Sequence, residues 1–157
     1  MKLIKINTKL AIFFVIGTFC LFPQSCTKER ADVIPDTPVY LSVNLINFPI
    51  GISQSRIFTN TMVGLPNLGY HNNGIIVYRE EENKFYAYDR TCTYQVESAI
   101  AVDLDYLTTF AVCPECNSKY QLWFSGFPTD EGPSVNPLKQ YAVSYNPNTQ
   151  DLVVQNF

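Results

Sequence analysis

Three of the five cysteines in this 157-residue chain lie where their thiols could share one site. They stand in two short segments, Asp89-Arg90-Thr91-Cys92-Thr93-Tyr94 and Cys113-Pro114-Glu115-Cys116-Asn117-Ser118-Lys119-Tyr120. Each segment directly follows a stretch with the pattern of a β-strand, so we expect both at a sheet end where loops converge. Thiols in exported proteins pair as disulfides, and thiolates also bind zinc or iron. An odd number of thiols therefore indicates one disulfide with a spare cysteine, or one site shared by all three.

Other catalytic patterns find no support in the sequence. The single histidine, His71, stands beside Asn72-Asn73-Gly74 and is predicted to be a turn residue. Ser118 has no histidine base near it in the sequence, which argues against nucleophilic catalysis. The sequence also lacks a glycine-rich phosphate loop and a pair of carboxylates at catalytic spacing. We therefore expect a protein that is not an enzyme.

The segments around the cysteines have the pattern of short β-strands. The ten tyrosines and eleven phenylalanines favour half-buried sheet positions. Strands are predicted over residues 39–45, 75–79, 85–88, 107–112, 120–124, 138–145 and 152–155. Residues 46–73 are predicted to be loops with short pieces of structure. Because these strands are closely spaced and separated by Gly- and Pro-rich turns, the sequence favours a small antiparallel sandwich or barrel over residues 39–157.

The two cysteine segments resemble the two boxes of the Rieske iron–sulfur family. A Rieske domain holds a [2Fe–2S] cluster between two loops, each of which supplies one cysteine and one histidine. The family's boxes read Cys-x-His and Cys-Pro-x-His-Gly-Ser-x-Phe, and the matching positions here are Cys92, Cys113, Pro114, Ser118 and Tyr120. Asn117 stands where a glycine is usual, and asparagine is the next best residue at positive φ.

The resemblance extends beyond the boxes, over about residues 70–157. The hairpin of residues 75–90 resembles the one that leads into the family's first box. Gly132-Pro133 and the strand after it resemble the proline loop that covers the family's cluster. The resemblance implies an all-β, Rieske-like antiparallel sandwich with a small two-loop subdomain of the cluster-binding type.

Both histidine positions of the family are replaced in this chain. Tyr94 stands at the first and Cys116 at the second, so the two-imidazole iron site that raises a Rieske potential cannot form. From the resemblance we expect no standard cluster and no other cofactor. Instead, Cys92 would pair with Cys113 or Cys116 in a structural disulfide, because the family's two cysteine ligands lie across one iron.

A second interpretation keeps a metal at the same place. Cys92, Cys113 and Cys116 would then bind an altered iron–sulfur cluster or a zinc ion, with a fourth ligand from Tyr94 or His71. With an altered cluster, the protein would pass electrons to a partner in the envelope. The two interpretations differ in ligand count, because the metal requires four good donors and the disulfide uses only two of three thiols.

The N-terminal segment predicts export and lipid anchoring. Lys2, Lys5 and Lys9 precede an apolar run over residues 10–22, which is typical of a signal peptide of residues 1–25. The segment ends at Ser25-Cys26, which resembles a bacterial lipobox, so Cys26 is the expected lipidation site. Residues 26–38 are then predicted to be a tether between the lipid and the domain.

Removal of the signal peptide makes the chain more acidic. Its three lysines are lost, so the formal net charge moves from −3 to −6. A domain of this charge is a poor ligand for nucleic acid, whose phosphates require clustered lysine and arginine. We therefore expect a lipid-anchored protein of the cell envelope, in the outer membrane, whose one indicated partner is the membrane itself.

Overall fold

A computed structural model describes residues 32–156. The predicted signal peptide, Cys26 and residues 27–31 of the predicted tether lie outside the described residues. Within residues 32–156, no helix is long and apolar enough to cross a membrane.

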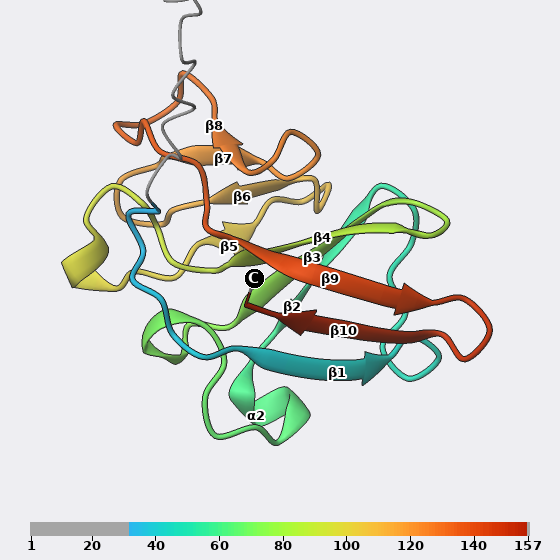
Figure 1. Cartoon of the computed structure of the whole chain (residues 1–157). Helices are drawn as coiled ribbons and strands as arrows, with labels where there is room; N and C mark the ends of the chain where they lie inside the picture. Colours follow the sequence, from blue (N-terminus) through green and yellow to red (C-terminus); the bar gives the residue numbers. More distant parts are fainter. Residues whose placement is uncertain (1–31, 157) are drawn as a thin grey trace, which may run out of the picture. The chain divides into compact units, whose positions relative to one another are not determined.

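The larger part of the fold is a six-stranded antiparallel sheet (Figure 1). Its strands, in the order β1-β10-β9-β4-β3-β2, are β1 (Tyr40–Asn44), β10 (Asp151–Gln155), β9 (Gln140–Asn146), β4 (Lys84–Asp89), β3 (Ile75–Glu81) and β2 (Gln54–Phe58). Three short helical turns lie in the loops, α2 (Asn60–Val63), η2 (Tyr70–Asn72) and η3 (Val96–Ser98). The predicted hairpin of residues 75–88 is β3 and β4, with Ile76 opposite Tyr88.

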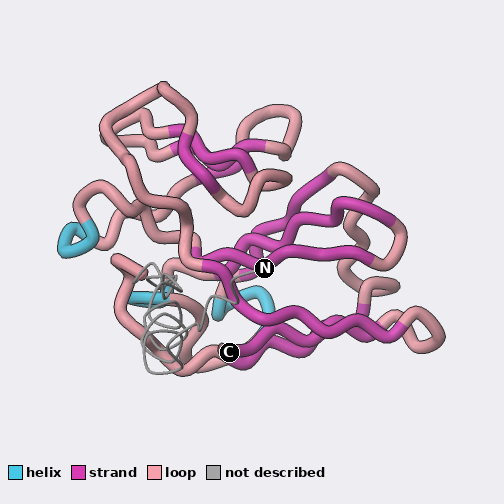
Figure 2. Tube along the Cα trace, turned by 45° about the horizontal axis from the view of Figure 1, so that its top comes forward, coloured by secondary structure: helices cyan, strands magenta, loops and turns pink. Residues whose placement is uncertain are grey.

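A second, smaller sheet lies between β4 and β9 in the sequence. Its four antiparallel strands, in the order β5-β6-β7-β8, are β5 (Asp103–Leu104), β6 (Phe110–Val112), β7 (Lys119–Gln121) and β8 (Phe127–Pro128). Figure 2 shows that loops make up most of this subdomain. The prediction of an all-β antiparallel fold with a small two-loop subdomain is confirmed.

Strand β3 is buried on both faces because it separates two apolar cores. Successive side chains of a strand point to opposite faces. Ile75 and Val77 belong to the core of the large sheet, whereas Ile76 and Tyr78 belong to the core beneath the small sheet. The second core also contains Cys92 and Cys113, with Val102, Ala111, Tyr120, Leu122 and Leu138. The cysteine loops are therefore attached to the large sheet through a packed apolar layer.

Two predicted strands are shorter in the structure than the sequence suggested. The stretch 107–112 forms a strand only from Phe110, because the Asp105 carboxylate accepts hydrogen bonds from the backbone N–H groups of Thr109 and Phe110 (3.0 and 3.1 Å) and closes a turn. The stretch 120–124 stops at Gln121, whose carbonyl accepts the N–H of Phe124 in the next turn. The strands β2, β5 and β8 were not predicted.

Residues 32–38, which the sequence assigns to the tether, are packed onto the domain. The side chain of Ile34 is buried, and its carbonyl accepts a hydrogen bond from Lys139 Nζ at 3.2 Å. Lys139 is itself buried and is ion-paired with Asp36 and, at 3.6 Å, with Asp32. This buried cation attaches the segment to the chain just before β9.

Candidate three-thiol site

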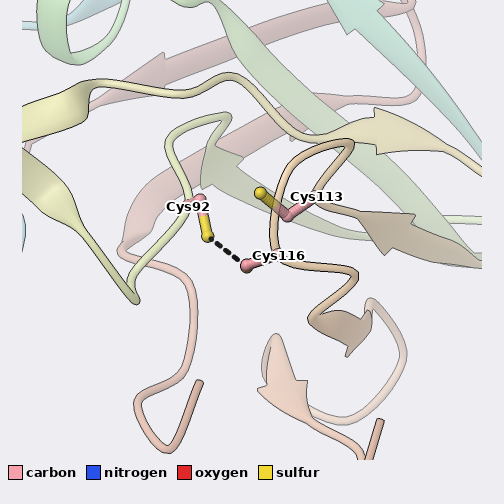
Figure 3. A group of neighbouring side chains, drawn as sticks. All are labelled: Cys92, Cys113 and Cys116. Atoms are coloured by element: carbon pink, nitrogen blue, oxygen red, sulfur yellow. Dashed lines mark hydrogen bonds between the residues drawn. The ribbon is translucent and has the colours of Figure 1, made fainter. Parts of the chain in front are cut away.

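The two cysteine loops meet at one end of the small sheet (Figure 3). Cys92 follows β4, whereas Cys113 and Cys116 lie in the turn between β6 and β7. The Sγ atoms of Cys92 and Cys116 are 3.6 Å apart, and all three Sγ atoms lie within 4.8 Å of one another. Cys92 and Cys113 are buried, and Cys116 is half-buried. The fold thus brings together thiols from positions 24 residues apart.

The Cys113–Cys116 turn is closed by its own backbone. The carbonyl of Cys113 accepts the N–H of Asn117 (3.0 Å), and the N–H of Cys113 donates to the carbonyl of Ser118 (2.9 Å). This closure requires a left-handed backbone conformation at position 117, and Asn117 adopts φ +58°. Asparagine tolerates this region better than most residues. The expected positive φ at Asn117 is therefore confirmed.

A buried hydroxyl network fixes the two cysteine loops and a third loop together. The Tyr120 hydroxyl accepts the N–H of Thr93 (3.1 Å) and lies 3.4 Å from Cys92 Sγ. The Thr93 hydroxyl donates to the carbonyl of Asn136 (2.7 Å) and contacts the Ser134 hydroxyl. The N–H of Ser134 donates to Ser118 Oγ at 3.0 Å. The loop around Ser134 is the one that the resemblance assigns to the cover of the site.

We predict that Tyr120→Phe destabilises the domain by about 1.5 kcal/mol, because it leaves the buried N–H of Thr93 without its acceptor. The measurement is the free energy of unfolding from a denaturant titration. Tyr94→Phe is the matched control, because the Tyr94 ring is 48% exposed, and it should change stability by less than about 0.5 kcal/mol. Equal losses in the two variants would contradict the prediction.

The thiols differ in their tendency to ionise. Burial raises the pKa of Cys92 to about 12, against the opposing effect of hydrogen bonds from the Tyr120 hydroxyl and the Tyr94 N–H. Burial also opposes ionisation of Cys116, but hydrogen bonds with the hydroxyl and backbone N–H of Ser118 and with the thiols of Cys113 and Cys92 together outweigh it and lower the pKa of that thiol. The Sγ of Cys116 and the Oγ of Ser118 are 3.1 Å apart. Cys116 is therefore the thiol of this pair that loses its proton more readily.

The structure gathers some of the predicted site residues and separates others. Cys92, Cys113 and Cys116 come together as expected. No histidine or carboxylate of residues 32–156 joins this group of metal-binding atoms, so His71 is not a ligand in this arrangement. His71 lies exposed in η2 with φ +50°, which agrees with its prediction as a turn residue.

All three thiols are free in the structure. The 3.6 Å between the sulfurs of Cys92 and Cys116 exceeds the disulfide bond length of about 2.05 Å. The expected disulfide is therefore not formed in this conformation, although this pair of sulfurs lies close enough for small loop movements to join them.

A small cavity of about 10 Å³ lies among the thiols. Its walls are Cys92, Tyr94, Gln95, Ile100, Cys113, Glu115 and Cys116. Sequence reasoning missed Gln95, Ile100 and Glu115 as wall residues. For Gln95, a signal was present, since it follows Cys92 at the spacing that separates Cys116 from Cys113.

The donor set does not fit the [2Fe–2S] cluster that the Rieske resemblance implies. A cluster of two irons and two sulfides needs four ligands, and the ligands of different irons lie farther apart than ligands of one iron. Here the three sulfurs lie within 4.8 Å of one another and enclose space for about one water-sized atom. Four thiolates around one zinc ion at about 2.3 Å stand roughly 3.8 Å apart, which is close to the 3.6 Å between the sulfurs of Cys92 and Cys116. The arrangement suits a single ion.

Solved structures similar to this chain share little of its sequence. This chain is similar to the ferredoxin of carbazole 1,9a-dioxygenase from Nocardioides aromaticivorans IC177, with 17% identity and a TM-score of 0.47. The match covers 78% of this chain and 100% of the ferredoxin. This chain is also similar to a protein assigned as the small subunit of an NADH-dependent nitrite reductase from Mycobacterium tuberculosis, with 13% identity and a TM-score of 0.42, over 78% and 98% of the two chains. No protein-family model and no curated protein matches the sequence.

Proposed function

We propose that this chain is an envelope-anchored, non-catalytic lipoprotein whose domain is stabilised by one zinc-class ion bound to Cys92, Cys113 and Cys116. The observation that carries the proposal is the convergence of three sulfurs within 4.8 Å from two separate loops. An ion at this place would join the loop after β4 to the turn between β6 and β7. It would thereby hold the small subdomain against the large sheet.

Zinc is the ion that this donor set favours. Thiolates are soft ligands that select zinc, copper(I) or iron–sulfur centres over magnesium and calcium. Zinc takes four ligands in tetrahedral geometry and has no redox chemistry, so a domain stabilised in this way would not transfer electrons. This role agrees with the replacement of both family histidines by Tyr94 and Cys116.

A disulfide between Cys92 and Cys116 is the second candidate, and the 3.6 Å between their sulfurs favours it. In an oxidising compartment this bond would stabilise the same two loops, by about 3 kcal/mol for a closed loop of this size. Cys113, buried beside the pair, would remain a free thiol. Both candidates give the protein the same non-catalytic role and differ in what joins the loops.

The test is the metal content of the whole chain, purified in detergent without added reductant, together with a map of its disulfides. We expect about one zinc ion per chain, and less than about 0.2 in Cys113→Ser, because two thiolates alone do not complete a tetrahedral site. Ser42→Ala is the control and should keep its zinc, since Ser42 is exposed on β1 and belongs to neither cysteine loop. Two irons and two sulfides per chain would refute the proposal. Metal-free protein with a mapped Cys92–Cys116 disulfide would replace it by the second candidate.

A further inference from the structure

We propose that the side-chain oxygen of Gln95 is the fourth ligand of this metal site. The inference rests on the proposed function, because it assigns the position that the three thiols leave open. It makes the site a closed, structural one with three sulfur donors and one oxygen donor, and it fixes a second point of the loop after β4.

The first support is the repeated spacing of the two loops. Gln95 follows Cys92 by three residues, as Cys116 follows Cys113. In the second loop this spacing places both residues along the same cavity, and the same is true of Cys92 and Gln95 in the first loop. Two pairs of residues with the same sequence spacing, one pair from each loop, therefore line the cavity.

The other candidates for the fourth ligand are less well placed. Glu115 lies along the cavity, but its carboxylate is not among the metal-binding atoms gathered there, and neither is the imidazole of His71. Of the polar side chains in the cavity wall, this leaves Tyr94 and Gln95. Tyr94 and Gln95 are both exposed, but the Tyr94 ring is rigid, whereas the amide of Gln95 ends a flexible chain that can turn toward the thiols. A neutral amide oxygen would also add no fourth negative charge to three thiolates.

Cobalt(II) absorption on the whole chain in detergent tests the inference, because the near-ultraviolet bands report the number of cobalt–sulfur bonds. We expect Gln95→Cys to increase the sulfur-to-metal band by about one third, since four thiolates replace three around the ion. Gln95→Ala should shift the visible bands and weaken cobalt binding about 10-fold. Tyr94→Phe and His71→Ala should both give the wild-type spectrum.

The outcomes separate this inference from the proposed function. If the wild-type chain binds neither cobalt nor zinc, the three-thiol metal site itself is wrong. If it binds cobalt and Gln95→Ala leaves spectrum and affinity unchanged, the metal site stands and Gln95 is not its ligand. A spectral change in Tyr94→Phe, with none in Gln95→Ala, would assign the fourth position to Tyr94 and overturn the inference.

Discussion

Replacing Asp89 by alanine is expected to destabilise the domain by about 4 kcal/mol. Asp89 ends β4, just before the first cysteine loop, and its side chain is completely buried. Its carboxylate accepts hydrogen bonds from the backbone N–H groups of Tyr70 (2.7 Å) and Thr91 (2.8 Å), and from the hydroxyl of Tyr141 (2.7 Å). Alanine would leave these three donors, two of them buried, without their acceptor, and the loss at each buried donor costs about 1–3 kcal/mol.

The control for this prediction is Asp89→Asn, which has nearly the same shape. Asparagine keeps one acceptor oxygen and removes the charge, so we expect about half of the alanine effect. The free energy of unfolding from a denaturant titration measures both variants. If Asp89→Ala unfolds at the wild-type denaturant midpoint with an unchanged slope, the carboxylate does not hold the loop entrance as described. Burial raises the pKa of Tyr141. The Asp89 carboxylate, which accepts the hydrogen bond of the Tyr141 hydroxyl, raises that pKa further.

The parts of the fold that could be predicted are those with a strong local pattern. The hairpin of β3 and β4 follows from β-branched and aromatic residues on either side of a polar turn. The closing hairpin of β9 and β10 follows from the turn residues between Asn146 and Gln150. The cysteine loops could be placed at a common sheet end for the same reason, since each follows a strand.

The parts that could not be predicted depend on contacts between distant residues. Strand β2 has the sequence Gln54-Ser55-Arg56-Ile57-Phe58, which is too polar to suggest a strand, and it forms because β3 offers it a partner edge. Strands β5 and β8 have two residues each and exist only by pairing with β6 and β7. For such elements, tertiary pairing outweighs local preference.

The support for a metal ion at the three-thiol site also depends on contacts between distant residues. From the sequence, the number of donors could be counted, but their mutual distances could not. Three sulfurs within 4.8 Å and a single-atom cavity are properties of the folded loops. Gln95 became a candidate only when it was found along the wall of that cavity.

Replacing Gly132 by alanine is expected to destabilise the domain by about 3 kcal/mol and to disturb the three-thiol site. Gly132 has φ +80°, and a Cβ atom on it would lie 2.4 Å from the backbone N and Cα of Ser118. These are backbone atoms of the cysteine turn, so they cannot move aside without displacing the Ser118 groups that bond Cys116. The expected loss of stability is the sum of two contributions: the free energy needed for this displacement, and the penalty of about 1–2 kcal/mol for a left-handed backbone at a residue with a Cβ atom.

Gly64→Ala separates the two contributions, because Gly64 has φ +70° and a Cβ atom on it would meet no other atom within 4 Å. We expect it to lose only the backbone penalty of about 1 kcal/mol and to keep the wild-type zinc content. Gly132→Ala should lose more stability than this and bind less zinc, as measured by denaturant titration and metal analysis of the whole chain. Equal effects at the two glycines would mean that the close approach of Gly132 to Ser118 does not matter, and that the third loop does not hold the cysteine turn in place.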